Sequence, residues 1–292
     1  MTNRIVQALE HGAGKLAKTL GEDSGKAIKD FYHDTGKRLR QDADDHLAND
    51  KAIADDMERI AKRHKGETDE TPVYHLDDDG NITRLRHDPT AANPADRYRH
   101  EALTQDDHDR LGLDSTSIGG PREGERLALL KDAKEGRSKP RPTASSQRIP
   151  AGSTDLAQAT QLARHADNSY GTHKKDTFTS NNYAAARVTG ANGNGDFILV
   201  GRSHRPDGVR TGAHSERMIG IPFLRQGEGS RIQDLYTERE PCSMAPNCSS
   251  WVAERLPHVQ VSHTVEYGDT SASRDAGNQA LQTYLDGLKA RR

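Results

Sequence analysis

Four residues in the C-terminal third of the chain have types and spacing that could build a catalytic metal site. His214 and Glu216 are separated by one residue, and Cys242 and Cys248, the chain's two cysteines, follow later. One imidazole and two thiolates supply three of the four ligands of a tetrahedral zinc ion. An open fourth position is typical of catalytic zinc, because water binds there, whereas structural sites are closed by four protein ligands.

Glu216 is placed to move protons at such a site. Zinc lowers the pKa of its bound water to about 7 in favourable sites, so a nucleophile forms at neutral pH. A carboxylate two residues from the His ligand can lie over that water without binding the metal. It can take the water's proton and pass it to a ring nitrogen and then to a departing ammonia. The pattern therefore predicts a zinc-dependent deaminase.

The same residues allow other interpretations. Cys242 and Cys248 alone could be a redox pair or a disulfide, and the set could be a structural zinc or disulfide module that serves binding. Zinc content, together with the effect of Glu216→Ala, separates these classes. The sequence has no Gly-x-x-x-x-Gly-Lys-Ser/Thr loop, no Gly-x-Ser-x-Gly elbow and no His-Glu-x-x-His helix. These absences argue against a P-loop nucleotide-binding protein, a serine hydrolase with a nucleophile elbow and a zinc metalloprotease.

Alternating helices and strands must bring these residues together. His214 is expected to open one helix and Cys248 the next, and helix N-termini favour thiolate over thiol. Pro222 is expected to stop the first of these helices. The fold class is therefore predicted to be α/β, a three-layer α/β/α mixed sheet of four to five strands. Apolar spacing predicts helices at 155–166, 214–221, 248–256 and 280–288, and strands at 183–188, 197–200, 232–240 and 259–267.

The N-terminal half is more polar and is predicted to be organised separately. Residues 1–70 show sparse helical spacing, for example at Ile53, Met57 and Ile60. Residues 71–138 contain a predicted β-hairpin at 71–86, with an Asp/Gly/Asn turn, and a short helix at 104–113. Residues 139–153 form a Pro/Ser-rich linker, so the catalytic domain is expected to span 154–292.

The composition excludes some classes of protein. Only 32% of the 292 residues are apolar, 29% are charged and the net charge is −2. The bulk charge therefore does not indicate a nucleic-acid or membrane binder. No segment approaches the roughly 18 apolar residues of a membrane helix, and charged residues interrupt the N-terminus where a signal peptide needs an apolar stretch. We expect no membrane insertion and no cleaved signal peptide.

The order His-x-Glu, then Pro-Cys, then a second Cys, on alternating helices and strands after a hairpin, resembles the zinc-dependent cytidine and nucleic-acid deaminase superfamily. The resemblance covers about residues 155–290 and is strongest to the deaminase domains of bacterial polymorphic toxins. It implies that His214, Cys242 and Cys248 bind zinc and that Glu216 shuttles protons. Two features depart from the family. Five residues rather than two separate the cysteines, so 243–247 must loop out. Many relatives carry a fifth strand after the last helix; here either that strand is absent or the end of the domain is assigned differently.

The resemblance also implies where a substrate would bind. In the family, the segment before Pro-Cys lines the base pocket. Aromatic rings on the strands are candidates for stacking on the base, although an aromatic residue in a strand more often belongs to the core or its rim. The loop before His214 has two possible interpretations. It is either a basic patch that contacts the phosphates of a nucleic acid or a simple solvated loop. The candidate substrate contacts are Tyr183, Ser215, Arg239, Glu240 and Pro241, with Tyr236 as a second stacking ring and Arg202, Arg205 and Arg210 as the patch.

The function expected from these features is hydrolytic deamination of a nucleic-acid base, with cytosine favoured over adenine. By resemblance, the protein is a delivered or secreted toxin that acts in the target-cell cytoplasm and is held in check by a cognate immunity protein. A free-nucleotide deaminase is the alternative with a different substrate. The long polar N-terminal half argues against it, because a metabolic enzyme has little reason to carry such a region.

Overall fold

The structure is a computed structural model that describes residues 71–113, 125, 141–174, 177–205, 207, 212–244 and 247–292. These residues belong to one compact unit, which spans residues 67–292. The helical spacing predicted for residues 1–70, Arg210 and Pro246 lie outside the described residues. Among the described residues, no helix is long and apolar enough to cross a membrane.

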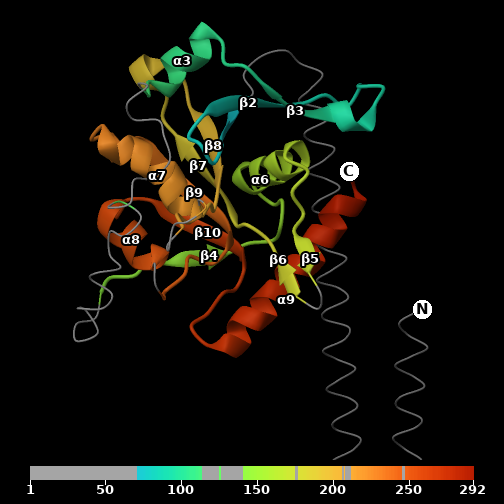
Figure 1. Cartoon of the computed structure of the whole chain (residues 1–292). Helices are drawn as coiled ribbons and strands as arrows, with labels where there is room; N and C mark the ends of the chain where they lie inside the picture. Colours follow the sequence, from blue (N-terminus) through green and yellow to red (C-terminus); the bar gives the residue numbers. More distant parts are fainter. Residues whose placement is uncertain are drawn as a thin grey trace, which may run out of the picture. The chain divides into compact units, whose positions relative to one another are not determined.

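An eight-stranded mixed sheet forms the centre of this unit (Figure 1). Its strand order is β3-β2-β1-β8-β7-β9-β10-β4. β7 pairs antiparallel with both β8 and β9, whereas β9, β10 and β4 run parallel to one another. The strands are β1 (Val73–Leu76), β2 (Ile82–His87), β3 (Tyr98–Glu101), β4 (Ser146–Arg148), β7 (Tyr183–Val188), β8 (Phe197–Arg202), β9 (Ile232–Arg239) and β10 (Gln260–Val265).

Helices cover both faces of the sheet, which makes three layers (Figure 1). α6 and α9 pack on one face, and α7 and α8 pack on the other. The helices are α3 (Gln105–Leu111), α6 (Asp155–Ala166), α7 (Ser215–Arg225), α8 (Cys248–Arg255) and α9 (Ser271–Ala290), with short 3-10 turns at Pro94–Arg97, Ala191–Gly193 and Gly229–Arg231 and a separate hairpin of β5 (Thr172–Lys174) and β6 (Thr177–Thr179).

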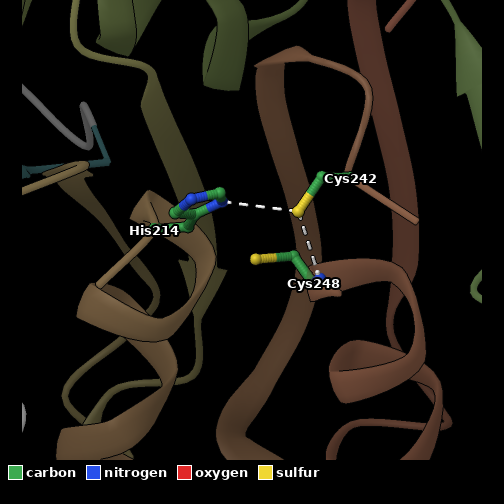
Figure 2. A group of neighbouring side chains, drawn as sticks. All are labelled: His214, Cys242 and Cys248. Atoms are coloured by element: carbon green, nitrogen blue, oxygen red, sulfur yellow. Dashed lines mark hydrogen bonds between the residues drawn. The ribbon is translucent and has the colours of Figure 1, made fainter. Parts of the chain in front are cut away.

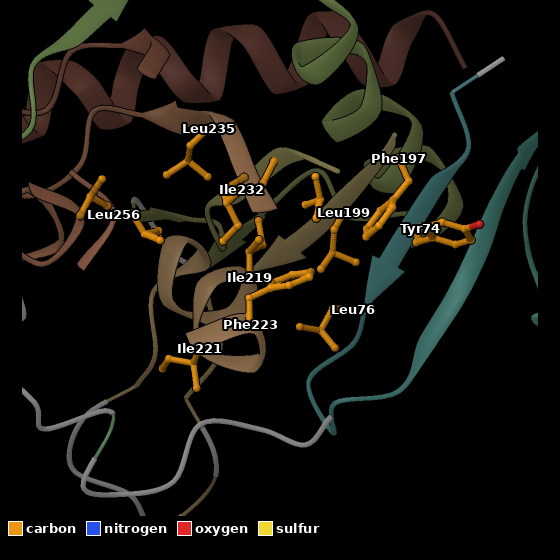
Figure 3. Packing of buried hydrophobic residues seen from close by; sticks show 14 of the residues in the cluster. Tyr74, Leu76, Phe197, Leu199, Ile219, Ile221, Phe223, Ile232, Leu235 and Leu256 are labelled. Atoms are coloured by element: carbon orange, nitrogen blue, oxygen red, sulfur yellow. The ribbon is translucent and has the colours of Figure 1, made fainter. Parts of the chain in front are cut away.

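The alternation of side chains along the strands divides the core into two faces. In β8, Phe197 and Leu199 join the cluster under α7 and α8, whereas Ile198 and Val200 join the cluster under α6. Figure 3 shows the first cluster, in which Ile219 of α7 packs near the strand residues. Successive strand residues point to opposite faces, so a sheet covered on both sides needs the continuous apolar run seen at 197–200.

The main helices and strands predicted for the C-terminal half are confirmed. The helix predicted at 155–166 and the strand predicted at 183–188 have the predicted bounds, and the hairpin at 71–86 is present as β1 and β2. The turn of that hairpin is held by Asp77, whose carboxylate accepts hydrogen bonds from the backbone N–H groups of Asp79 and Asn81. The three-layer α/β architecture is therefore correct.

The predicted number of strands was wrong, because the sheet has eight strands and not four to five. The hairpin strand β1 pairs in parallel with β8, and β4 pairs in parallel with β10. The sheet therefore crosses the boundaries predicted at residues 138/139 and 153/154. β4 is the edge strand of the sheet on this side. It lies beside β10, which is the last strand of the predicted domain.

Pro222 does not stop helix α7, which continues to Arg225. Proline removes one backbone donor, in this case the bond to the carbonyl of Met218, and it usually ends or kinks a helix. Here tertiary packing outweighs that preference, because Ile219, Ile221 and Phe223 are all buried in the core cluster around the proline.

Gly220 permits close contact between α7 and α8. A Cβ atom at this position would lie 2.7 Å from Cη2 of Trp251, a distance that real side chains do not adopt. The indole ring therefore packs directly against the backbone of α7. This contact fixes the N-terminus of α8, where Cys248 lies, relative to the N-terminus of α7, where His214 lies.

Candidate active site

His214 is held at the N-terminus of α7. Its backbone is extended, and its carbonyl accepts hydrogen bonds from the N–H groups of Arg217 and Met218, so it is the N-cap of the helix. The preceding residue, Ala213, pairs with His204 through two backbone hydrogen bonds of 2.8 and 2.9 Å. The imidazole is thus carried by a residue that is fixed on both sides.

The two cysteines meet at the N-terminus of α8. Asn247 caps this helix by accepting a hydrogen bond from the N–H of Ser250, and it adopts a left-handed backbone conformation that asparagine tolerates. The backbone N–H of Cys248 donates to Sγ of Cys242 at 3.4 Å. A helix N-terminus therefore points at a sulfur atom, which favours its thiolate form.

Three donor atoms converge between the two helices (Figure 2). Nδ1 of His214 lies 3.5 Å from Sγ of Cys242, and all three donors, including Sγ of Cys248, lie within 4.8 Å of one another. Both cysteines are free thiols. The structure thus brings together the three metal ligands predicted from the sequence.

The donor set fits a zinc ion. Zinc–nitrogen and zinc–sulfur bonds of about 2.0 and 2.3 Å at a tetrahedral angle place the two donor atoms about 3.5 Å apart. The observed separation between His214 and Cys242 has this value. A cluster of one imidazole and two thiols is also a ligand set that zinc prefers.

Contacts within this cluster and burial shift the pKa values of its members. The hydrogen bond with Cys248 and the contact with His214 lower the pKa of Cys242, although burial opposes this. Burial and the neighbouring Cys242 raise the pKa of Cys248. For His214, burial lowers the pKa, but the contact with Cys242 outweighs it and the net shift is upward. A metal ion would displace protons from such a set.

Glu216 lies beside this cluster with only 3% of its surface exposed. Burial raises its pKa, and the opposing charge of His214 does not cancel that shift. Oγ of Ser215 donates to its carboxylate at 3.3 Å. A buried carboxyl group with a raised pKa can both accept and donate a proton near neutral pH, which is the property of a general acid–base group.

Asn182 connects the two halves of the site, and the sequence analysis did not identify it. Its Nδ2 donates to Oγ of Ser215 at 2.9 Å and to Oγ1 of Thr237 at 2.6 Å. Its Oδ1 accepts from the backbone N–H of Arg239 at 3.0 Å. One amide thus joins the start of α7 to the end of β9. The only signal for it in the sequence is its position directly before the strand 183–188.

The predicted stacking rings do not face the site. Tyr183 and Tyr236 are both fully buried in the cluster under α6. The hydroxyl of Tyr183 donates to Asp167 at 2.5 Å, and that of Tyr236 bonds to Thr264 at 2.8 Å. A ring with no exposed face cannot stack on a base, so the two tyrosines are core residues. They are buried because their side chains lie on the face of the sheet that α6 covers.

The other predicted substrate contacts are placed near the cysteine loop but are engaged within the protein. The guanidinium of Arg239 donates to Asn278 and lies over the ring of Tyr267, and Glu240 accepts from the backbone N–H of Tyr267. Pro241 and Ser215 are buried. In the predicted basic patch, Arg202 is paired with Asp78 at 2.5 Å.

One family model matches the segment that contains this site. Residues 179–284 match the family described as Xanthomonas-like deaminase. The match includes His214, Glu216, Cys242 and Cys248, and it supports deamination, the hydrolysis of a C–N bond, as the reaction of this segment. Comparison with curated proteins and with solved structures gave no match.

Proposed function

We propose that the protein is a zinc-dependent hydrolytic deaminase that acts on a nucleic-acid base, with Glu216 as the proton shuttle. The observation that carries the proposal is a buried carboxyl group of raised pKa beside three converging metal donors. A structural site would close the metal with a fourth protein ligand, and a disulfide module would join the two sulfur atoms, which are free thiols here.

His214, Cys242 and Cys248 would hold the zinc ion. When bound, zinc supplies Lewis-acid chemistry that allows water to act as a nucleophile at neutral pH. Glu216 accepts a proton from the attacking water and delivers it to the ring nitrogen of the substrate. A second proton transfer through the same carboxyl group releases ammonia, so that water replaces the amino group with a carbonyl oxygen and the proton balance closes.

Ser215, Asn182 and Thr237 hold Glu216 in place. Ser215 donates to the Glu216 carboxylate and accepts from Asn182, which is itself tied to β9 through Thr237. A general base acts only from a defined position, and small displacements are costly in rate. Ser215, Asn182 and Thr237 are therefore positioning residues in the proposed mechanism: they hold the carboxylate of Glu216 without touching the substrate.

The proposed substrate is a base in DNA or RNA, with cytosine favoured over adenine. The proposed role is that of a polymorphic toxin that is delivered or secreted, acts in the target-cell cytoplasm and is inhibited by an immunity protein. The resemblance of the motif to the toxin branch and the long polar N-terminal segment support this role over that of a metabolic free-nucleotide deaminase.

The test uses the full chain, because strands outside residues 151–292 complete the sheet. The purified protein is incubated with single- and double-stranded DNA and RNA and with free nucleotides, and the products are sequenced or separated by chromatography. We expect C-to-U conversion in a polymer. In the Glu216→Gln variant, we expect conversion to fall by at least about 100-fold, the lower end of the usual general acid–base contribution, with zinc content unchanged.

Other outcomes lead to different conclusions. Conversion of free nucleotides alone would favour the metabolic enzyme, and A-to-I conversion would change the proposed base. Full activity in Glu216→Gln would refute the catalytic assignment. A zinc-free protein with Cys242 and Cys248 oxidised together would favour the disulfide module.

A further inference from the structure

A second group of metal-type donors lies where β1, β3 and the end of α6 meet. His75 is on β1, His100 is on β3 and Asp167 is the C-cap of α6. One ligand atom from each of the three residues lies within 4.8 Å of the other two. Nε2 of His100 is 2.9 Å from Oδ1 of Asp167, and Nε2 of His75 is 3.4 Å from Oδ2. All three residues lie outside the deaminase match at 179–284.

The buried nitrogen of His75 is not accounted for by hydrogen bonding. Its side chain is only 4% exposed, and Nε2 has no hydrogen-bond partner among the described residues. Buried polar atoms without a partner are rare in folded proteins and need an explanation. Metal–nitrogen and metal–oxygen bonds of about 2.1 Å at a tetrahedral angle place the two donors about 3.4 Å apart, which is the separation between His75 and Asp167.

The surrounding residues orient the donors as they do at known types of metal site. Oγ1 of Thr83 bonds to Nδ1 of His100 at 2.8 Å, so Nε2 is the nitrogen that faces Asp167. The hydroxyl of Tyr183 donates to Asp167. Ligating imidazoles and carboxylates usually have such partners, which fix their orientation.

The guanidinium of Arg202 lies near the cluster, and acidic residues neutralise its charge. Nη1 of Arg202 is 3.8 Å from Oδ2 of Asp167. The same guanidinium donates two hydrogen bonds to Asp78, at 2.9 and 2.5 Å, and Asp78 also lies 3.1 Å from Nδ1 of His204. The two carboxylates of Asp78 and Asp167 therefore outnumber the single guanidinium of Arg202, which suits a cation.

We propose that His75, His100 and Asp167 form a second metal site that binds a divalent transition metal of the zinc type. Two imidazoles and one carboxylate are a ligand set that zinc accepts, and the partial exposure of His100 leaves room for a water molecule as a further ligand. The site joins two strands of the N-terminal hairpin region to α6. It therefore fastens the strands outside the deaminase match to the catalytic domain.

Metal stoichiometry tests this proposal in the full chain. The metal-free protein is titrated with Zn²⁺ against a chromogenic chelator, and in parallel with Co²⁺. We expect two equivalents to bind in the wild type. His100→Gln should bind one, while the control His108→Gln, on the exposed surface of α3, should still bind two. Thr83→Ala should weaken the second equivalent by about 10-fold or more, the usual effect of losing a residue that orients a ligand.

The Co²⁺ spectrum separates this site from the proposed catalytic one. Thiolate ligands give a sulfur-to-metal charge-transfer band, so Co²⁺ bound by Cys242 and Cys248 is detected by this band. Co²⁺ in the second site, which has no thiolate, gives only weak d–d bands. In His100→Gln we expect the charge-transfer band to remain and one equivalent to be lost. Asp167→Asn provides a second variant in case the histidine change perturbs β3.

Three results would overturn the proposal. One is binding of a single equivalent in the wild type together with the charge-transfer band, another is unchanged stoichiometry in both His100→Gln and Asp167→Asn, and the third is an equal loss in His108→Gln. If the band is absent but one equivalent binds and is lost in His100→Gln, the second site is present and the zinc-dependent deaminase assignment fails. Failure of the second site can therefore be distinguished from failure of the zinc-dependent deaminase assignment.

Discussion

A series of side-chain hydrogen bonds links Glu216 to strand β9. Ser215 contacts the carboxylate, Asn182 contacts Ser215, and Thr237 anchors Asn182 to β9. Asn182 also fixes the backbone of Arg239, two residues before the loop that begins with Pro241. Asn182 thus joins α7 and β9 through hydrogen bonds, in addition to the apolar packing between them.

Replacement of Asn182 by alanine tests this role. Asn182→Ala should lower kcat by about 10–100-fold, as expected when an orienting partner is lost, with a smaller change in KM and with zinc content retained. The free energy of unfolding should fall by about 1–3 kcal/mol, because the polar groups of Thr237 and Arg239 are left without a partner.

The neighbouring Asn181 provides the matched control. It is exposed, and it uses its backbone carbonyl to accept a hydrogen bond from Arg164. Asn181→Ala should keep wild-type kcat and stability. Equal losses in the two variants, or loss of zinc in Asn182→Ala, would assign Asn182 a merely structural role.

The sequence was sufficient to predict that His214, Glu216, Cys242 and Cys248 would lie together, because metal chemistry needs these residue types in a recognisable order. It was not sufficient for Asn182, or for the buried pair of Arg164 and Glu238, whose side chains have no exposed surface and meet in two hydrogen bonds of 2.5 Å. A charged residue is normally assigned to the surface. Its burial depends on a partner 74 residues away, which no local pattern reveals.

At the scale of elements, predictability followed the length of each pattern. The helices and the six- to eight-residue strands of the C-terminal half carry enough apolar positions to show their period. β3 and β4 have four and three residues, mostly polar and partly exposed. Such short edge strands are defined by the neighbours with which they pair, β2 and β10, and this pairing is a property of the folded chain.

The contact between α7 and α8 can be tested with two glycines. In an exposed helix, Gly→Ala stabilises by about 0.5–1 kcal/mol. At Gly287 in α9, nothing lies within 4 Å of the new Cβ atom, so Gly287→Ala should show this gain. At Gly220 the Cβ atom would lie 2.7 Å from Trp251, so Gly220→Ala should have the opposite sign and destabilise the protein.

Zinc binding provides the second measurement for this pair. A shift of Trp251 moves α8, and therefore Cys248, relative to His214. Gly220→Ala should weaken zinc binding, whereas Gly287→Ala should leave it unchanged. Chemical denaturation and chelator competition measure the two effects. A gain in stability for both variants would show that α7 and α8 do not depend on this contact.

At the scale of the whole unit, the strands outside the deaminase match complete the core rather than decorate it. Tyr74 and Leu76 of β1 are fully or almost fully buried in the cluster under α7, and the hydroxyl of Tyr74 donates to Asp107 at 2.6 Å. β1 also satisfies the backbone hydrogen bonds along one edge of β8. Removal of β1 would expose both the apolar side chains and an unpaired strand edge.

This arrangement predicts how the chain can be shortened. A fragment of residues 67–292 keeps every strand of the sheet and should unfold cooperatively with native α/β circular dichroism. A fragment of residues 154–292, which is the domain predicted from the linker at 139–153, lacks β1 to β4. Each fully buried apolar side chain contributes about 1.5–3 kcal/mol, so the loss of β1 alone is comparable to the net stability of a typical domain.

The shorter fragment should aggregate or unfold without a cooperative transition, as measured by size-exclusion chromatography and thermal denaturation. Equal midpoints for the two fragments would show that residues 154–292 fold as an independent domain.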